Sequence, residues 1–354
     1  MSRNIYTIIL LVLGSFSPSF AGNPDRQGES GAYELLINPW ARSGGLHSIN
    51  TSSVMGIEAM QINIAGLSRL LNSEIGLANT QLFKGSTLTM SSFGYGTKIG
   101  KSGTLGVCIT SLSFGDIPIT TVNLPEGVGG NFSPNFFNLG LGYSHMYENR
   151  ISVGLLVRAI SESIADVSAF GFAIDAGVQY VSGENDNFRL GISLRNTGSP
   201  MKFGGQGLSF QAANPDIQTP GVEYPLTYDE RAEDFELPSM LNIGTSYDFY
   251  WNTTKKEYVR AMVNFTSNAF SRDQLGIGAE FVYRDIFILR GAYKKDVGGT
   301  VANFEDDVYT GLSAGATFSF PMKKGSDTRL GLDYGFRATS PFNGTHSLSL
   351  RLSL

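Results

Sequence analysis

The last ten residues of the chain, 345–354, read THSLSLRLSL. Leucine occupies every second position from Leu348 to Leu354, and serine or arginine occupies the positions between. Successive side chains of an extended chain point to opposite faces, so this alternation predicts a β-strand with one apolar and one polar face. Two settings fit such a strand: the edge of a soluble sandwich, or the closing strand of a membrane barrel whose leucines face lipid.

The same alternation recurs through most of the sequence, for example over residues 188–195, 259–265 and 329–337. It predicts strands at residues 74–83, 86–99, 103–116, 135–147, 151–162, 169–182, 188–203, 237–251, 256–267, 273–284, 286–296, 309–322, 328–340 and 345–354. An even number of strands is usual for bacterial barrels, and membrane strands need ~9–11 residues. The predicted fold is all-β: a transmembrane antiparallel barrel of about 14 strands. A soluble sandwich is the alternative.

The first 21 residues resemble an export signal. Arg3 precedes a short apolar run at residues 5–14, and Ser19 and Ala21 place small residues at the usual cleavage positions. We therefore expect a signal peptide at residues 1–21; the alternative is a buried N-terminal strand. No other stretch offers the ~20 apolar residues that a membrane helix needs. Together with the barrel, this predicts a bacterial outer-membrane location.

Composition agrees with one large all-β domain, because the 354 residues include 43 glycines and 12% aromatic residues. The net charge of −5 gives no reason to expect nucleic acid as a partner. The lone cysteine, Cys108, excludes an intramolecular disulfide framework. Stability must then come from packing and hydrogen bonds, and a closed barrel supplies the latter by pairing every strand.

Residues 22–73 differ from the strands that follow. They are polar and glycine-rich as far as Gly45, and Asn63 can then cap a short helix from Ala65 to Leu71. A barrel of this size has an interior wide enough to need filling. We expect residues 22–73 to form an N-terminal plug or periplasmic segment and residues 74–354 to form the barrel.

An even barrel has both chain ends on one side, which is the periplasm in the outer membrane. The short connections then lie on the periplasmic side; they are 100–102, 148–150, 183–187, 252–255, 284–285 and 323–327. The long connections at 117–134, 204–236 and 297–308 face outward. Short inner turns and long outer loops are the usual asymmetry of these proteins.

The two longest loops are the candidate partner-binding surface. Loop 204–236 is acidic and carries interspersed aromatic residues, whereas loop 117–134 is apolar and rich in proline and glycine. The first is either a solvated loop, a binding surface or a calcium site, although the strict spacing of a calcium loop is absent. The second is either a lid or a docking loop. The candidate residues are Ile117, Pro118, Pro125, Phe132, Phe210, Tyr224, Tyr228 and Phe235.

Charged residues fall on the polar face of many predicted strands. They are Arg158, Asp175, Arg189, Arg195, Arg260, Glu280, Arg290, Arg329, Asp333, Arg337 and Arg351. We favour an internal ion-pair network that fills the barrel; a charged permeation path is the alternative. No catalytic constellation is found: His47, His145 and His346 are isolated, and no nucleophile or phosphate-binding motif stands in a fitting context. We expect no enzyme activity, no metal and no cofactor.

Three N-terminal motifs and one C-terminal segment carry a family resemblance. The motifs are ARSGG at 41–45, GIEA at 56–59 and NIAGL at 63–67; the segment comprises LDY at 332–334 and GTHSLS at 344–349. Together they resemble the PorV/PorQ family over essentially the whole mature chain. Ile64 replaces a proline that is common in that family, and Asn63 can still cap the helix. The matching plug residues are Arg42, Glu58, Asn63, Gly66 and Leu67.

The resemblance implies a FadL-like, fourteen-stranded outer-membrane barrel with an N-terminal plug. Family members take part in type IX protein secretion in Bacteroidota, where one branch binds the signal domain of secreted cargo and another tethers a surface component. We therefore expect a non-catalytic, protein-binding secretion accessory. Its partners would be outer-membrane lipid, other envelope or secretion-system proteins, and secreted cargo. The alternative is a FadL-like channel for hydrophobic small molecules. We favour the accessory because a channel requires a continuous apolar route, and the inward faces of the strands carry charges.

Overall fold

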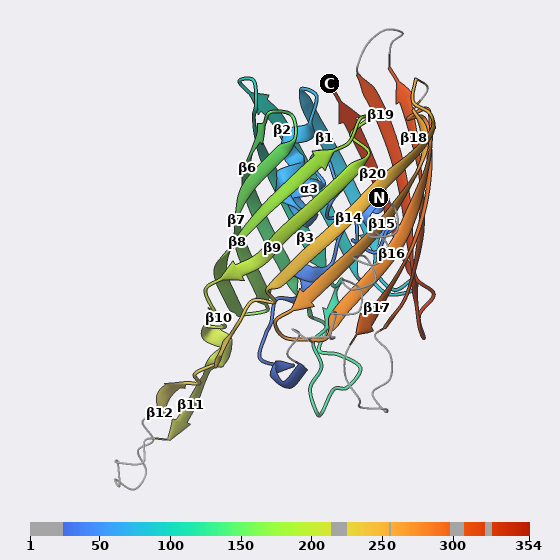
Figure 1. The fold of residues 1–354 in the computed structure, drawn as a ribbon. Coiled ribbons are helices and arrows are strands. Elements are labelled where there is room, and N and C mark those ends of the chain that lie inside the picture. Colours follow the sequence, from blue (N-terminus) through green and yellow to red (C-terminus); the bar gives the residue numbers. More distant parts are fainter. Residues whose placement is uncertain (1–23, 214–224, 255, 298–307, 323–327) are drawn as a thin grey trace, which may run out of the picture.

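A computed structural model describes residues 24–213, 225–254, 256–297, 308–322 and 328–354. Fourteen strands form one closed antiparallel barrel, in which the first strand pairs with the last (Figure 1). They are β1 Ser73–Gln81, β2 Thr89–Ile99, β3 Gly103–Ser113, β6 Asn135–Tyr147, β7 Ile151–Ile164, β8 Val167–Ser182, β9 Phe188–Gly198, β14 Met240–Asn252, β15 Glu257–Asn268, β16 Asp273–Tyr283, β17 Phe287–Val297, β18 Tyr309–Pro321, β19 Arg329–Thr339 and β20 Thr345–Ser353. The predicted fold is confirmed, and every predicted strand overlaps an observed one.

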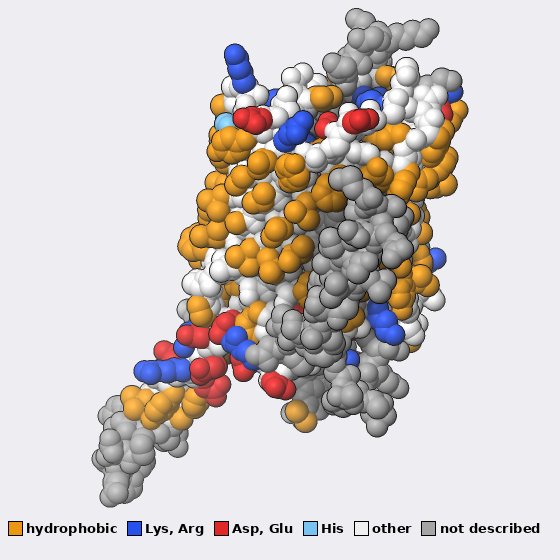
Figure 2. Space-filling model, in the orientation of Figure 1, with side chains coloured by type: hydrophobic (Ala, Val, Ile, Leu, Met, Phe, Trp, Pro, Cys, Tyr) orange, Lys and Arg blue, Asp and Glu red, His pale blue; other side chains and the backbone are white. Residues whose placement is uncertain are grey.

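The alternation of β20 has the predicted orientation. Leu348, Leu350 and Leu354 are 63%, 40% and 47% exposed on the outer face, whereas Ser347 and Ser349 are buried inside. Apolar side chains cover the visible outer wall in a broad band (Figure 2). A closed barrel with an apolar exterior and a polar interior is the architecture of outer-membrane proteins, which confirms the predicted location. Among the described residues, no helix is long and apolar enough to cross a membrane.

The two ends of the barrel differ. At one end, which we call the turn end, strands are joined by short connections such as those after β6 and β16. In both connections two consecutive residues have positive φ, namely Glu148 and Asn149, then Arg284 and Asp285. This conformation matches the right-handed twist of the paired strands. The longer connections leave the opposite end, the loop end, which is extracellular in outer-membrane barrels.

Described residues 24–72, which precede β1, contain five short helices, and the last three lie inside the barrel: η1 Pro24–Arg26, η2 Tyr33–Leu36, α2 Ala41–Gly44, α3 Ala59–Ile62 and η3 Ile64–Arg69. The helix predicted at residues 65–71 is η3, a 3-10 helix that begins one residue earlier and ends two residues earlier. Asn63 caps it by accepting a hydrogen bond from the Ala65 amide (3.2 Å). The Asn63 side chain also donates to the carbonyls of Thr51, Val178 and Ile192, which ties the plug to β8 and β9.

The plug runs through the barrel from the loop end to the turn end. Ser30 forms a β-bridge with Glu236 in the longest loop, and Arg26 pairs with Glu236 (2.9 Å) and lies over the Phe270 ring. At the turn end, the Asn72 carbonyl accepts from the Lys98 amide. Residues 24–36 therefore lie at the loop end (Figure 1), and the division into an N-terminal segment at 22–73 and a barrel at 74–354 stays a prediction. The predicted signal peptide, residues 1–21, lies outside the described residues.

Two loops at the loop end contain strands of their own. In one, β4 Ile117–Pro118 pairs with β5 Asn131–Phe132. In the other, β10 Met201–Lys202 pairs with β13 Asp234–Phe235, then η4 Gln206–Leu208 leads into β11 Ser209–Ala213, which pairs with β12 Pro225–Asp229. We call residues 201–213 and 225–235 the arm; it projects away from the barrel (Figure 1). The predicted strand 188–203 ends earlier, at Gly198: its pairing with β14 stops at Arg195, and its register with β8 shifts beside Asn196, which has a φ of 56°.

Cysteine labelling on intact cells tests this topology. D25C in the plug and D229C in the arm should both react with a membrane-impermeant maleimide, because both sites are exposed at the loop end. E184C, in the short turn after β8, should react only after the cells are lysed. The native Cys108 is 4% exposed and should stay silent. Labelling of E184C but not D25C on intact cells would reverse the orientation.

Candidate functional site

A belt of polar side chains crosses the inner wall toward the turn end. Nine neighbouring strands each contribute one residue to it. Around the wall these strands are β1, β20, β19, β18, β17, β16, β15, β14 and β9. In the same order, the residues are Glu74, Arg351, Asp333, Thr317, Arg290, Glu280, Arg260, Asp248 and Arg189. Every neighbouring pair in this series is joined by an ion pair or a hydrogen bond. We call this series the charged belt.

Contacts in the charged belt are short. Arg260 lies 2.6 Å from Asp248 and 3.3 Å from Glu280, and Arg290 lies 3.2 Å from the same glutamate. Arg351 completes the series with Asp333 at 2.8 Å. Buried charges are tolerated only when they are paired and hydrogen-bonded, and alternating signs on adjacent strands meet that requirement. The belt therefore stabilises the wall from inside.

The plug is anchored to this side of the lumen. Arg42 and Glu58, two predicted plug residues, form an ion pair (3.7 Å), and Glu58 also accepts from the Ser43 amide (2.6 Å). Glu74 of the charged belt accepts from the Ile57 amide (2.9 Å). The hydrogen bond from the Ile57 amide to Glu74 thus fixes the backbone of the plug to the charged belt.

The remaining predicted lumen charges lie apart from the belt. Arg158 pairs with Asp175 at 2.9 Å on β7 and β8, and Arg195 donates to the Leu35 carbonyl of the plug. Arg329 bonds to Ser319 at the turn end, and Arg337 lies over the Tyr309 ring. The predicted lumen charges therefore fall into the charged belt and separate contacts beside it, because the height of each residue in the staggered wall decides which charges meet.

Three neighbouring strands have uncharged inner faces over much of their length. No inward residue is charged over residues 90–96 of β2, 106–112 of β3 and 138–144 of β6. We call this part of the wall the uncharged sector. Its inward positions are occupied by glycines, hydroxyl residues, one amide and apolar residues: Met90, Ser92, Gly94, Gly96, Gly106, Cys108, Thr110, Leu112, Asn138, Gly140, Gly142 and Ser144.

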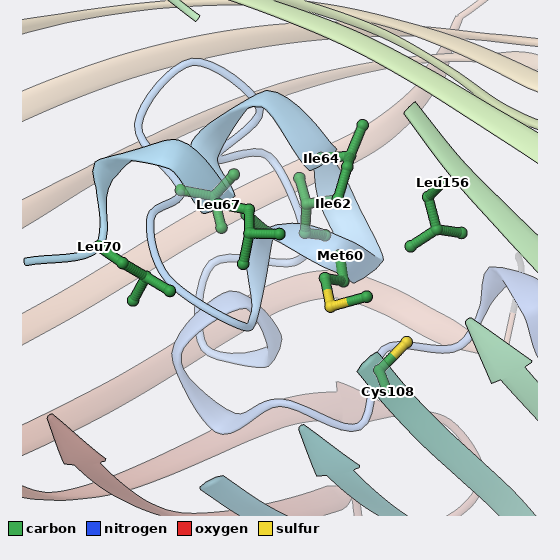
Figure 3. Close-up of a cluster of buried hydrophobic side chains, with 9 residues drawn as sticks. Met60, Ile62, Ile64, Leu67, Leu70, Cys108 and Leu156 are labelled. Carbon is green, nitrogen blue, oxygen red and sulfur yellow. The ribbon is translucent and has the colours of Figure 1, made fainter. Parts of the chain in front are cut away.

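The apolar face of the plug lies directly on the glycines of this sector. A Cβ at Gly96 would be 2.8 Å from Leu70 and one at Gly142 would be 2.7 Å from Ile64, so side chains larger than hydrogen do not fit. Met60 and Leu67 approach the wall in the same way, and Met60 lies near Cys108 and Leu156 (Figure 3). In the part of the chain that the structure describes, no hydrogen bond joins plug residues 24–70 to β2 or β3. The plug meets β2 and β3 through dispersion contacts alone, whereas on β6 the Ser144 hydroxyl donates to the Ala65 carbonyl of the plug (2.9 Å).

The apolar lining continues to the loop end. Leu82, Met90 and Leu112 form a buried cluster there, and Phe114 and Phe136 pack against it. Met90 and Leu112 also belong to the uncharged sector, and a row of uncharged polar residues, Ser92, Thr110 and Asn138, separates them from the apolar contacts of Met60 and Leu70. This side of the plug therefore faces a wall that is uncharged but not continuously apolar. The glycine-rich inward positions of β2, β3 and β6 are the sequence signal for this sector.

The structure disperses the predicted partner-binding residues. Phe210 and Tyr228 stack at 5.7 Å on the exposed arm. Phe235 instead packs against the buried cluster of Ala32, Leu35 and Met201, so it belongs to the base of the arm. Ile117, Pro118, Pro125 and Phe132 lie in and around the β4–β5 hairpin. Tyr224 and loop residues 298–307 lie outside the described residues.

Other chemistry is sparse among the described residues. They contain no group of three His, Cys, Asp or Glu side chains that could hold a metal. Burial and the nearby charges of Lys294 and Arg337 lower the pKa of His47 to about 3, so this plug residue is neutral at physiological pH. An apolar groove of about 510 Å³ crosses β18, β19, β20 and β1, but its lining residues Leu332, Leu348 and Leu350 face lipid rather than the lumen.

No known protein-family profile and no curated protein matches the sequence. Solved structures do match. The CymD monoaromatic hydrocarbon channel superposes with a TM-score of 0.57 at 15% identity over 90% of this chain and 98% of CymD. The toluene transporter TodX of Pseudomonas putida gives 0.52 at 14% identity, covering 86% and 96% of the two chains. A FadL homologue of Pseudomonas aeruginosa gives 0.53 at 10% identity, covering 90% and 98%.

The chain has the fold of these FadL-type outer-membrane barrels. At such low identity the likeness concerns the architecture: fourteen strands around an N-terminal segment. The finer resemblance to the PorV/PorQ family stays a prediction.

Breaking the charged belt should destabilise the barrel. In D248N, Arg189 and Arg260 lose the carboxylate between them, and we expect a loss of about 3 kcal/mol in the free energy of unfolding. K256Q removes the exposed Lys256–Asp285 pair, whose lysine side chain is 68% exposed, and should cost less than about 1 kcal/mol. Urea unfolding in detergent, followed by the fluorescence of Trp40 and Trp251, measures both. Equal stabilities would show that the belt contributes nothing.

Proposed function

We propose that the protein is a non-catalytic outer-membrane channel for small, uncharged hydrophobic molecules. The observation that carries the proposal is the uncharged sector, where apolar plug residues lie on a glycine-lined wall without a hydrogen bond to β2 or β3. The shared fold with hydrocarbon channels supports it. The route would follow this sector from the apolar cluster at the loop end to Leu70.

The boundaries between the plug and the wall differ in the free energy needed to open them. Separating the plug from the charged belt or from β7–β9 breaks buried hydrogen bonds such as Ile57–Glu74 and Met60–Arg158, and each orphaned group costs about 1–3 kcal/mol. Separating it from β2 and β3 breaks only dispersion contacts, which an apolar solute restores as it enters. A charged solute finds no partner there and pays its full desolvation cost. Selectivity for apolar molecules follows from this asymmetry.

Two matched disulfides test the position of the route. A Cβ at Gly94 on β2 would lie 3.3 Å from the Ile57 Cβ, and a Cβ at Gly276 on β16 would lie 3.4 Å from the Ile49 Cβ. Both distances are close to the separation that a disulfide needs. In a C108A background, I57C/G94C therefore locks the plug to the uncharged sector, and I49C/G276C locks it to the opposite wall.

Uptake of a fluorescent hydrophobic solute into liposomes containing each variant is the measurement. Oxidised I57C/G94C should lose at least tenfold in uptake and recover on reduction, whereas I49C/G276C should behave like the C108A parent in both states. Solute leakage through protein-free liposomes sets the background. Equal uptake by the two oxidised variants would place the route elsewhere, and uptake at background by the parent would contradict the channel.

A second candidate function rests on the arm. In the β11–β12 ribbon, Phe210 faces Tyr228 and Ala212 faces Leu226 on one side, while Ser209 and Asp229 share the other. The apolar side is open: Phe210 is 47%, Leu226 42% and Tyr228 36% exposed. A two-stranded ribbon is marginally stable alone in water, and a protein that covers this face would stabilise it. Binding of an envelope protein or of secreted cargo, as in the type IX accessory role, would use this surface.

Site-specific photo-crosslinking tests the second function. A photoreactive residue at Tyr228 should form an adduct with a secretion-system component or a secreted protein in native membranes. The variant F210S/L226S should reduce that adduct at least fivefold, because it removes the apolar face of the arm. V122S, which changes a fully exposed valine in the other loop, is the control and should leave the adduct intact. Adducts with lipid alone would argue against a protein partner.

A further inference from the structure

Two glutamates meet where the outer part of the plug contacts the wall. Glu34 lies on η2 of the plug beside Leu35, and Glu162 lies on β7 opposite Ala169 of β8. Leu35 and Ala169 belong to one buried cluster, which brings the two carboxyl groups to the same site. The two glutamates are only 5% and 4% exposed. Apolar residues surround the site, including Leu35 from the plug and Ile160 and Met201 from the loop end of the barrel. Two carboxylates in such surroundings cannot both carry a charge without a large cost.

Hydrogen bonding leads to the same conclusion. Glu34 Oε2 and Glu162 Oε1 are both buried and have no partner. An ionised carboxylate only accepts hydrogen bonds, so two ionised groups facing each other cannot bond. A single proton converts one of them into a donor, and the pair then forms a direct link between plug and wall.

The charges of the neighbouring side chains also favour a glutamate pair that holds one proton. The charged groups nearby are Arg158 on β7, Asp175 on β8 and Arg195 on β9, and the un-ionised thiol of Cys108 on β3 also faces Arg158. Arg158 bonds Asp175 at 2.9 Å, and Arg195 donates to the Leu35 carbonyl. Two arginines and one aspartate sum to +1, so a glutamate pair with charge −1 makes the cluster neutral. A pair with charge −2 leaves one buried negative charge uncompensated.

We propose that Glu34 and Glu162 share one proton that latches plug residues 30–38 to β7, and that losing this proton at alkaline pH releases the segment. The latch would make the loop end of the plug sensitive to external pH, since Ser30 also bridges the base of the arm. The latch holds the outer part of the plug whatever the lumen carries.

The direction of the pH effect follows from linkage. Burial and the adjacent negative charge of Glu162 raise the pKa of Glu34 to about 8. Once the segment is released into water, Glu34 regains its ordinary pKa near 4.5. The latched state therefore binds more protons, so the latch is fully stable below the ordinary value and is lost as pH rises through about 8. The population of the released state should rise by up to tenfold per pH unit across this window.

Backbone hydrogen exchange of the folded protein in detergent micelles measures the latch. After correction for intrinsic exchange rates, protection of residues 30–38 should fall steadily from pH 6 to pH 8 and then level off. In E34Q the glutamine amide can donate to an ionised Glu162, so protection should no longer depend on pH. E162Q leaves Glu34 buried but removes the negative charge beside it, so the slope should become smaller. E29Q changes an exposed carboxylate in the same stretch, paired to Arg26, and should keep the wild-type slope.

A pH-independent wild-type protein, or a slope that survives in both E34Q and E162Q, would overturn the proposal. Infrared spectroscopy of the unmodified protein gives a second reading that does not rely on the variants folding well. A protonated carboxyl band should be present at pH 6 and absent at pH 9. Its absence at pH 6 would show that no proton is shared.

Discussion

The structure depends on one constraint: within the membrane, every backbone amide and carbonyl must find its partner inside the protein. The pairing of β1 with β20 satisfies it, because Glu74–Gln81 lie opposite His346–Ser353 and leave no open edge. Closure then creates a lumen that must be filled. The plug fills it, and each inward side chain of the wall faces either the plug or a neighbouring strand.

That arrangement divides the lumen into two kinds of boundary. Along the charged belt, alternating charges satisfy one another and Glu74 also holds the backbone of the plug. Along β2 and β3, glycines allow Ile57, Leu67 and Leu70 to approach the wall without polar bonds. The first boundary is costly to open and the second is not. A solid plug is therefore compatible with passage along one side.

Much of the fold could be predicted because it depends on patterns among residues close together in the sequence. Period-two alternation located the fourteen strands, and Asn63 marked the start of η3. Strand 188–203 was predicted too long because the left-handed Asn196 carries no local signal that distinguishes a bulge. The path of the plug could not be predicted, since its contact with Glu236 joins residues about two hundred positions apart. Arg329 and Arg337 lie apart from the belt because neighbouring strands are offset along the barrel axis. Side-chain alternation carries no information about that offset.

The sequence by itself determined the class of the protein, because side-chain alternation has the same meaning wherever a strand pairs. It also determined which residues face inward, including the glutamates and glycines of the lumen. Only the tertiary structure decided which inward residues meet: the shear of the closed barrel aligns Glu74, Arg351 and Asp333 into one belt and leaves the glycines of β2 and β3 opposite the apolar face of the plug. These meetings are long-range contacts, and their energies arise only after closure brings distant strands together.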